Sequence, residues 1–222
     1  MSASSPASAD SSAAVLLVDK PAGVTSHDVV AQVRRERDMR TGHSGTLDPF
    51  ATGLLIVLIG REATRCQARF MALPKTYRVV ARFGAVSTTG DPDGEITKTG
   101  SLPPPGPLDL PTGTIWQRPP VYSAIKIRGV RAHRRARRGE DVQMPPRQVT
   151  VHRFEQLWRA SDRAELEVVC SSGTYVRSLV SDLGDAYCER LRRTAIGPFE
   201  VEEAGALMAL DAALGRLSGA AA

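Results

Sequence analysis

A single carboxylate, Asp48, stands in a glycine-rich stretch between two apolar segments. The stretch spans residues 42–53 and also contains three glycines and His43. The glycines permit backbone conformations and close approaches that a side chain would block, and Pro49 confines Asp48 to extended dihedrals. A carboxylate held in this way is a candidate catalyst. The competing interpretation is a turn or cap residue, because aspartate bonds readily to its own nearby backbone.

Two hydrolytic chemistries would use residues of this stretch. Residues 42–45 resemble a serine nucleophile elbow, but that motif needs a glycine two positions after the serine, where Thr46 stands. A glycosidase would pair Asp48 with Asp91 or Asp93, but both of these lie in sequences typical of turns. We therefore expect Asp91 and Asp93 to be turn residues.

The elements predicted around Asp48 anchor it in a core. Apolar residues predict strands at 15–18 and 54–59, and alternation at 75–83 predicts a strand with Tyr77 on its buried face. The other predicted elements are strands at residues 121–127, 147–155 and 164–171, and helices that begin at Thr25 or Ser26, run from Glu62 to about Met71, and follow the glycine turn at 173.

Three side chains have both a structural and a functional interpretation. Lys20 follows the first strand, where a solvated turn residue is expected. Tyr77 fits a core aromatic with a wet hydroxyl. Arg177 lies in the first turn of a predicted helix, where a cation opposes the helix dipole and therefore calls for an anionic partner. The alternative for Arg177 is a free surface arginine.

A basic segment follows residue 127. If it is helical, like charges share one face at spacings that destabilise an isolated helix. Because no acid intervenes before Glu140, we expect polyphosphate contact, with a solvated surface as the alternative. The arginines on that face are Arg131, Arg134, Arg135 and Arg138.

Composition and length predict a soluble globular chain with enough apolar residues for a sizeable core. The chain has 222 residues, 42% of them hydrophobic, and a formal charge of +5. No segment approaches the roughly 20 apolar residues of a membrane span. The three cysteines show no metal-site or dithiol spacing, so we expect the cytoplasm and no metal. Expected boundaries are a disordered tail (1–14), a catalytic domain (15–211) with a basic insertion (about 126–147), and a frayed C-terminus (212–222).

Four separated blocks, in order, resemble the TruB family, the tRNA pseudouridine-55 synthases. Together they extend over about residues 15–211, and four ordered blocks are far more specific than one. The blocks are the Asp48 stretch, Lys75-Thr76-Tyr77 with the later Thr89-Gly90-Asp91-x-x-Gly94, Pro119-Pro120-Val121-Tyr122-Ser123-Ala124-Ile125-Lys126, and Gly173-Thr174-Tyr175-Val176-Arg177 with Leu191-Arg192-Arg193-Thr194.

The resemblance implies a fold and an activity. The fold is α+β, a pseudouridine synthase fold with a central mixed, largely antiparallel sheet, flanking helices and an RNA-gripping insertion. The activity is isomerisation of uridine to pseudouridine at position 55 in the T loop of tRNA, by base flipping, glycosidic cleavage and rejoining through C5. It needs no cofactor, and we expect a monomer. The resemblance is to a bacterial type without the C-terminal RNA-binding domain, and residues 97–113 and 184–191 are shorter than the family pattern.

The resemblance also implies roles for individual residues. Asp48 is the catalytic carboxylate, by nucleophilic attack or by support of an elimination, and Arg177 pairs with it. Tyr77 stacks on the target uracil and moves a proton. The other implied contacts are His43 in the space left by the flipped base, Tyr175 and Leu191 in the uracil pocket, Lys20 near the active-site loop, and Arg128, Arg131, Arg134, Arg135 and Arg138 on the RNA backbone.

Two rival functions remain open for the sequence. The first is a tRNA-binding or folding protein without catalysis, which would bind RNA and give no product. The second is a glycosidase or nucleosidase, for which release of free uracil is the sign. The combination of Asp48, Tyr77 and Arg177 argues against both, because a binding protein has no need of it.

Overall fold

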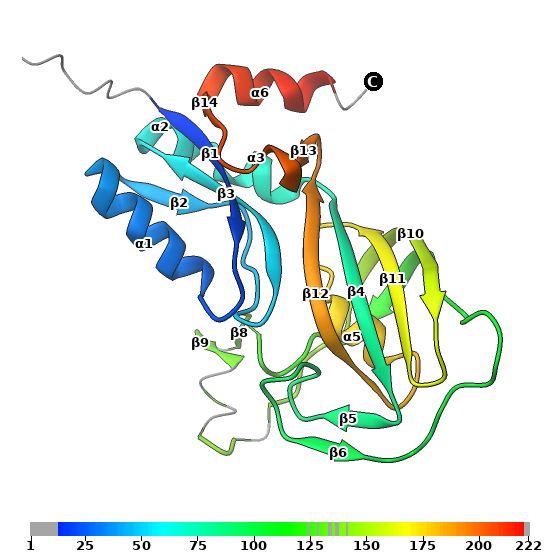
Figure 1. Cartoon of the computed structure of the whole chain (residues 1–222). Coiled ribbons are helices and arrows are strands. Elements are labelled where there is room, and N and C mark those ends of the chain that lie inside the picture. Colours follow the sequence, from blue (N-terminus) through cyan, green and yellow to red (C-terminus); the bar gives the residue numbers. More distant parts are fainter. Residues whose placement is uncertain are drawn as a thin grey trace, which may run out of the picture.

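The computed structural model describes residues 13–123, 125–127, 129–132, 135, 138–140 and 142–219. Within this part of the chain, ten strands form one sheet in the order β14-β1-β3-β12-β4-β11-β10-β7, with β2 on β3 and β13 on β12 (Figure 1). The parallel pair β3–β12 is set among antiparallel neighbours. This arrangement confirms the α+β class and the mixed, largely antiparallel sheet.

The described elements have the following bounds. The strands are β1 (Ala14–Lys20), β2 (Thr41–His43), β3 (Thr52–Ile59), β4 (Lys75–Phe83), β5 (Ala85–Ser87), β6 (Ile96–Lys98), β7 (Gly113–Gln117), β8 (Lys126–Ile127), β9 (Val130–Arg131), β10 (Arg147–Arg159), β11 (Arg163–Cys170), β12 (Ala186–Ile196), β13 (Phe199–Glu200) and β14 (Leu207–Ala209). The helices are α1 (Ser26–Arg37), α2 (Arg61–Arg65), α3 (Gln67–Ala72), α5 (Val176–Ser181), α6 (Leu210–Gly219) and the 3-10 turn η1 (Val201–Glu203).

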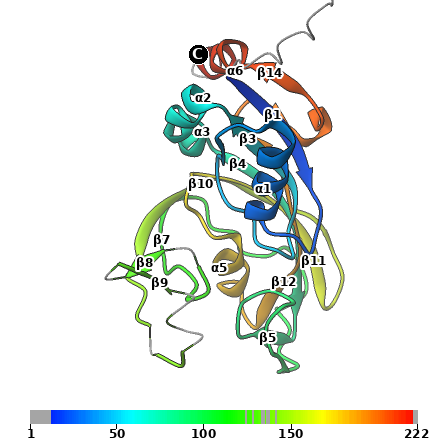
Figure 2. The same cartoon turned by 90° about the vertical axis from the view of Figure 1, so that its left-hand side faces the viewer.

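Strand β3 is a buried strand of the core that directly follows the Asp48 stretch in the chain. Six of its residues, Leu54 to Ile59, are at most 2% exposed, because α1 and α3 pack on opposite faces of this half of the sheet. In the other half, α5 covers one face of β4, β11 and β12, with Val176, Leu179 and Val180 buried against the sheet (Figure 2). The two halves meet at β12.

Strand β12 is the main element that the sequence did not predict. It lies between β3 and β4 and pairs Arg193 with Gly53 in parallel register. Its charged sequence obscures the alternation: Leu191 and Arg193 are buried, whereas Arg190 is exposed. A strand with arginines on both faces has no apolar period for sequence reasoning to find.

Several other boundaries differ from expectation. The strand predicted at 121–127 is reduced to the two residues of β8, and residues 121–123 form a bend. The helix predicted from Glu62 divides at Cys66 into α2 and α3. The C-terminus is not frayed from residue 212, because α6 continues to Gly219 and buries Ala213. The first twelve residues lie outside the described part.

None of the helices in the described ranges is long and apolar enough to cross a membrane.

Candidate active site

The Asp48 loop connects β2 to β3, and hydrogen bonds join it to the start of α1. The hydroxyl of Ser26, at the start of α1, donates to the Leu47 carbonyl at 3.2 Å and accepts from the Leu47 N–H at 2.8 Å. The Ala51 N–H donates to the Asp48 carbonyl at 3.1 Å, which closes a tight turn over Pro49. These bonds hold the carboxylate at a defined place rather than on a mobile loop.

Lys20 anchors the same loop from inside the core. Its side chain is fully buried, and Nζ donates to the carbonyls of Pro21 and Val24 at 2.8 Å and of Pro49 at 3.3 Å. The expected solvated turn residue is therefore wrong. Burial lowers the pKa of Lys20, and the nearby Asp48 carboxylate raises it. Lys20 is not among the residues that line the cavity, so it positions the loop.

Arg193 supports the loop from β12. Its guanidinium is 1% exposed and donates to the carbonyls of Leu54 at 2.7 Å, Gly45 at 3.2 Å and Thr46 at 3.5 Å. Sequence reasoning assigned Arg193 no role. A buried arginine surrounded by carbonyls thus joins strand β12 to the Asp48 loop.

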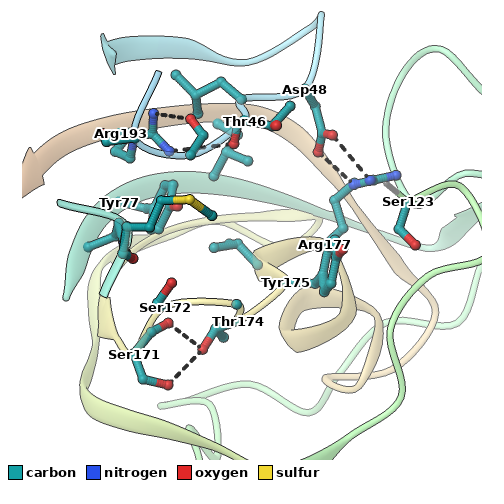
Figure 3. A pocket seen from close by; sticks show the side chains of 18 of the residues that line it. Thr46, Asp48, Tyr77, Ser123, Ser171, Ser172, Thr174, Tyr175, Arg177 and Arg193 are labelled. Carbon is teal, nitrogen blue, oxygen red and sulfur yellow. Dashed lines mark hydrogen bonds and ion pairs between the residues drawn. The ribbon is translucent and has the colours of Figure 1, made fainter. Parts of the chain in front are cut away.

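Arg177 of α5 lies between two carboxylates. Its Nε lies 2.9 Å from Asp48 Oδ2, Nη2 donates to Asp48 Oδ1 at 3.3 Å, and Nη1 lies 3.0 Å from Asp91 Oδ2 (Figure 3). Nη1 and Nη2 also donate to the carbonyls of Thr89 and Tyr122. The helix dipole predicted an anionic partner for Arg177, and the structure shows two, Asp48 and Asp91.

Asp91 is more than the turn residue that the sequence suggested. It is 4% exposed and accepts from the Thr89 hydroxyl and from the Asp93 N–H, so the turn chemistry is real but serves a buried ion pair. The carboxylate of Asp93 is exposed and contacts neither Asp48 nor Arg177 among the described interactions. The signal that sequence reasoning missed was Arg177 itself, whose guanidinium has more donors than one carboxylate can satisfy.

Desolvation dominates the electrostatics of Asp48. It raises the pKa of this carboxyl above its ordinary value; Arg177 and Lys20 oppose the shift, whereas the Asp91 charge adds to it. About a third of the Asp48 side chain stays exposed. Its carboxylate is therefore poorly solvated yet accessible, which are the conditions for a reactive oxygen nucleophile.

A cavity of about 270 Å³ opens beside Asp48. In Figure 3, Asp48 and Arg177 lie on one side of it and Tyr77 on the other, with Ser171, Ser172 and Thr174 at the far wall. Apolar and aromatic side chains line it from several elements. They include Tyr77 of β4, Leu191 of β12, Met71 of α3 and Tyr175 before α5. Flat apolar walls beside one carboxylate suit a planar heterocycle.

Tyr77 fits both of its interpretations. It is 9% exposed and packs in the core, and its burial raises the pKa of the phenol, which the Arg193 guanidinium opposes. It also lines the cavity beside Asp48. At neutral pH the hydroxyl is protonated and acts as a hydrogen-bond donor.

Tyr175 is positioned by its backbone. The buried side-chain amide of Gln117 accepts from the Tyr175 N–H at 2.8 Å and donates to the Tyr175 carbonyl at 3.0 Å. The guanidinium of Arg147 lies 5.0 Å from the Tyr175 ring centroid, a cation–π distance, and donates to the Gly173 carbonyl. Sequence reasoning singled out neither Gln117 nor Arg147.

His43 lies at the edge of the site. Its Nδ1 accepts from the Gly45 N–H at 3.2 Å, which places the proton of the neutral ring on Nε2. Burial lowers the pKa of His43, so the neutral ring dominates at neutral pH. The neighbouring Ser44 and Gly45 line the cavity, whereas His43 does not.

The basic insertion differs from the expected helix face. Arg131 ends strand β9 and is therefore not part of a helix, and Arg135 pairs with Glu140 at 2.5 Å. Arg138 is exposed. Arg128 and Arg134 lie outside the described residues.

Over the described residues, no group of three or more His, Cys, Asp or Glu side chains is placed to hold a metal ion.

The sequence pattern of the TruB family pseudouridylate synthase N-terminal domain matches residues 33–176, more than half of the chain. The chain belongs to the TruB family of pseudouridylate synthases. Among curated TruB relatives, it is 45% identical to tRNA pseudouridine synthase B of Corynebacterium aurimucosum and 44% identical to that of Thermobifida fusca. These matches cover 89% of this chain and 71% and 74% of the two relatives.

Solved structures show the same fold. The chain superposes with a TM-score of 0.61 and 28% identity on a chain of a Cbf5-Nop10-Gar1 complex, covering 84% of this chain and 50% of that one. A chain of an H/ACA RNP bound to a substrate RNA containing 2'-deoxyuridine gives 0.61 and 26%, covering 84% and 48%. The TruB chain thus spans about half of each of these longer chains.

Proposed function

We propose that this protein isomerises uridine to pseudouridine at position 55 in the T loop of tRNA. Conversion of uridine to pseudouridine in tRNA is the activity named for its curated relatives. The position in tRNA and the residue roles are the further content of the proposal. The observation that carries it is the placement of Asp48, held by Arg177, across a base-sized cavity from Tyr77.

The reaction breaks the C1′–N1 bond, forms a C1′–C5 bond and transfers the C5 proton, in net terms, to N1. Asp48 attacks the sugar or the ring, or supports an elimination at the ribose, and its geometry suits each route. Arg177 orients both carboxylate oxygens and stabilises the ionised form against desolvation. Tyr77 stacks on the detached uracil, keeps it in the cavity while it turns, and moves the proton.

The remaining predicted residues bind the RNA. The base must leave its stack to reach Asp48, which takes a few kcal/mol. Tyr175 and Leu191 supply new apolar contacts for the flipped uracil, and His43, beside the cavity, occupies the vacated space. The insertion arginines contact the backbone of the folded T loop, which is recognised by shape and phosphates. They are Arg128, Arg131, Arg134, Arg135 and Arg138.

We also propose that the protein acts in the cytoplasm as a monomer, with neither metal nor cofactor. Protein dialysed against a chelator should keep its full turnover on RNA that was folded beforehand.

Substitution of the carboxylate tests the catalytic role. Asp48→Asn should abolish turnover of an unmodified tRNA transcript and leave the Kd for that RNA within a few fold, because shape and hydrogen bonding are retained. Asp93→Asn, a nearby exposed carboxylate, is the control and should keep turnover. Retained turnover in Asp48→Asn would remove Asp48 from its role, binding without product in the wild type would favour a non-catalytic protein, and free uracil would indicate a nucleosidase.

A further inference from the structure

The described arginines differ in whether a carboxylate lies beside them. Seven of those in the large sheet, α5 and α6 lie within 4.0 Å of one: Arg78, Arg82, Arg153, Arg163, Arg177, Arg192 and Arg216. Arg61, Arg65 and Arg69 of α2 and α3 are exposed and have no such partner among the described residues. We call these three the arginine row.

The arginine row follows the α2–α3 segment. Arg61 and Arg65 are four residues apart in α2, a spacing that places their side chains on one helical face about 6 Å apart. Arg69 follows four residues later in α3. Cys66, between the two helices, has φ −83° and ψ 1°, and its N–H donates to the carbonyls of Glu62 and Ala63, so it ends α2, and α3 begins at the next residue. Like charges at this spacing destabilise a helix, which indicates a function other than stability.

The row leads to the mouth of the cavity. Met71, at the end of α3, lines the cavity and is 42% exposed. Gln67, at the start of α3, donates to the His43 carbonyl at 2.7 Å and so joins α3 to the strand before the Asp48 loop. In Figure 2, α2 and α3 lie on the same side of the molecule as β8 and β9 of the insertion. The segment that carries the arginine row therefore ends at the cavity, and it lies on the same side of the molecule as the basic insertion.

The end of α1 extends this basic surface. Its exposed Arg35 and Arg37 also lack a carboxylate partner among the described residues. The exposed Arg40 follows them, and its carbonyl accepts from the Gly60 N–H at 2.7 Å, immediately before α2. Glu62 is the one acidic residue of α2 and α3. At the end of α1 the arginines alternate with the exposed acids Glu36 and Asp38, so the excess of positive charge is larger on α2 and α3.

We propose that the arginine row binds successive backbone phosphates of the double-helical stem that adjoins the target loop. The inference rests on the proposed function, because it places the target base in the cavity. A stem leaving the mouth on the α3 side passes Arg69 first, then Arg65 and Arg61. The insertion holds the loop while the row holds the stem, so the two together set the direction in which the RNA enters. Phosphate contacts of this kind position an RNA without reading its sequence.

The salt dependence of binding measures these contacts. The triple variant R61Q/R65Q/R69Q should bind a full-length unmodified tRNA transcript with a Kd weakened by about tenfold to a hundredfold at 0.1 M salt. The slope of log K against log salt should decrease in magnitude by about 2, since each phosphate contact contributes roughly 0.7–0.9. R61K/R65K/R69K keeps the charges and should keep most of the slope. The kcat at saturating RNA should be unchanged in both.

Two controls locate the effect. Arg190→Gln removes an exposed arginine of β12 that also has no described carboxylate partner, and the slope should stay unchanged in this variant. Arg65→Gln alone should decrease the magnitude of the slope. A hairpin that retains the T loop on a stem of two or three base pairs should bind wild type and triple variant equally. An unchanged slope in the triple variant, or an equal loss with the short hairpin, would overturn the proposal.

The two proposals fail in different ways. Absence of pseudouridine with the wild-type protein contradicts the proposed function, and the salt slope of binding still decides whether the row contacts RNA. Pseudouridine formation by the wild type with an unchanged slope in the triple variant contradicts the arginine row alone.

Discussion

At the scale of residues, the site is organised by one guanidinium between two carboxylates. Arg177 is 3% exposed, and a buried cation is stable only when it is fully paired. Asp91 pairs with Arg177 and takes no part in the reaction itself. This second ion pair holds the guanidinium of Arg177 in place beside Asp48. The second carboxylate is thus a positioning residue for the first.

Replacement of Asp91 should disturb catalysis without contact with substrate. Asp91→Asn keeps the shape but removes a charge, so Arg177 is released to move toward Asp48 and the carboxylate shifts. Because small misplacements of reacting groups are expensive, kcat should fall by about 10²-fold. Single-turnover rates check this, and Asp93→Asn is the matched control. Equal effects of the two substitutions would contradict the positioning role.

The pKa of Asp48 predicts the acid limb of the activity. Desolvation raises this pKa above 3.8, so the reactive ionised form is lost at a higher pH than for an ordinary aspartate. The single-turnover rate should therefore decline as the pH falls, with a midpoint above 3.8. Since the Asp91 charge contributes to the shift, Asp91→Asn should move the midpoint to lower pH. A midpoint at or below the ordinary value in the wild type would contradict this account.

At the scale of elements, the β3–β12 pair controls the loop. Gly53 has φ +107°, and a Cβ there would lie 2.2 Å from the Arg193 carbonyl oxygen. The two backbones approach this closely only because residue 53 has no side chain. The approach also brings the Arg193 side chain to the carbonyls of the Asp48 loop, so strand pairing and loop position are coupled.

Gly53→Ala should therefore reduce both stability and turnover. The steric overlap and the positive φ should destabilise the fold by about 2–3 kcal/mol or more, and the displaced loop should lower kcat. Gly215→Ala is the control, because a Cβ on this α6 glycine would meet open space and the substitution should stabilise by about 0.5–1 kcal/mol. Denaturant titration and single-turnover assays measure the two effects; a neutral Gly53→Ala would show that the strands can separate freely.

The sequence predicted those elements whose side chains alternate or form apolar runs. Strands β1, β3, β4, β10 and β11 and helices α1 and α5 follow from such patterns. It did not predict β12, because charged side chains from both faces hide its period. For the same reason Arg193, a buried arginine in a basic run, was assigned no role, and Lys20, a buried lysine beside a turn, was expected to be solvated. Burial of a cation depends on carbonyls brought together by the tertiary fold, which no local pattern records.

At the scale of the whole molecule, the two halves of the sheet have different tasks. The half around β3 holds the Asp48 loop, and the half around β4 and β11 carries Tyr77 and, through α5, Arg177. The cavity is lined by residues of both halves, so the proposed function has the uracil contact both. The resemblance of four sequence blocks found these residues because the blocks come from both halves. It did not indicate the contacts of Asp91 and Gln117 with the residues around α5, nor those of Arg193, which join β12 to the Asp48 loop.

The most direct test of the central claim is position-resolved detection of pseudouridine in an unmodified tRNA transcript incubated with the purified protein. Product should form at the T-loop uridine at position 55, at no other uridine, and should disappear with a transcript that carries cytidine at that position. Product at another uridine in the wild-type transcript, or none at all with RNA that binds, would contradict the proposed function.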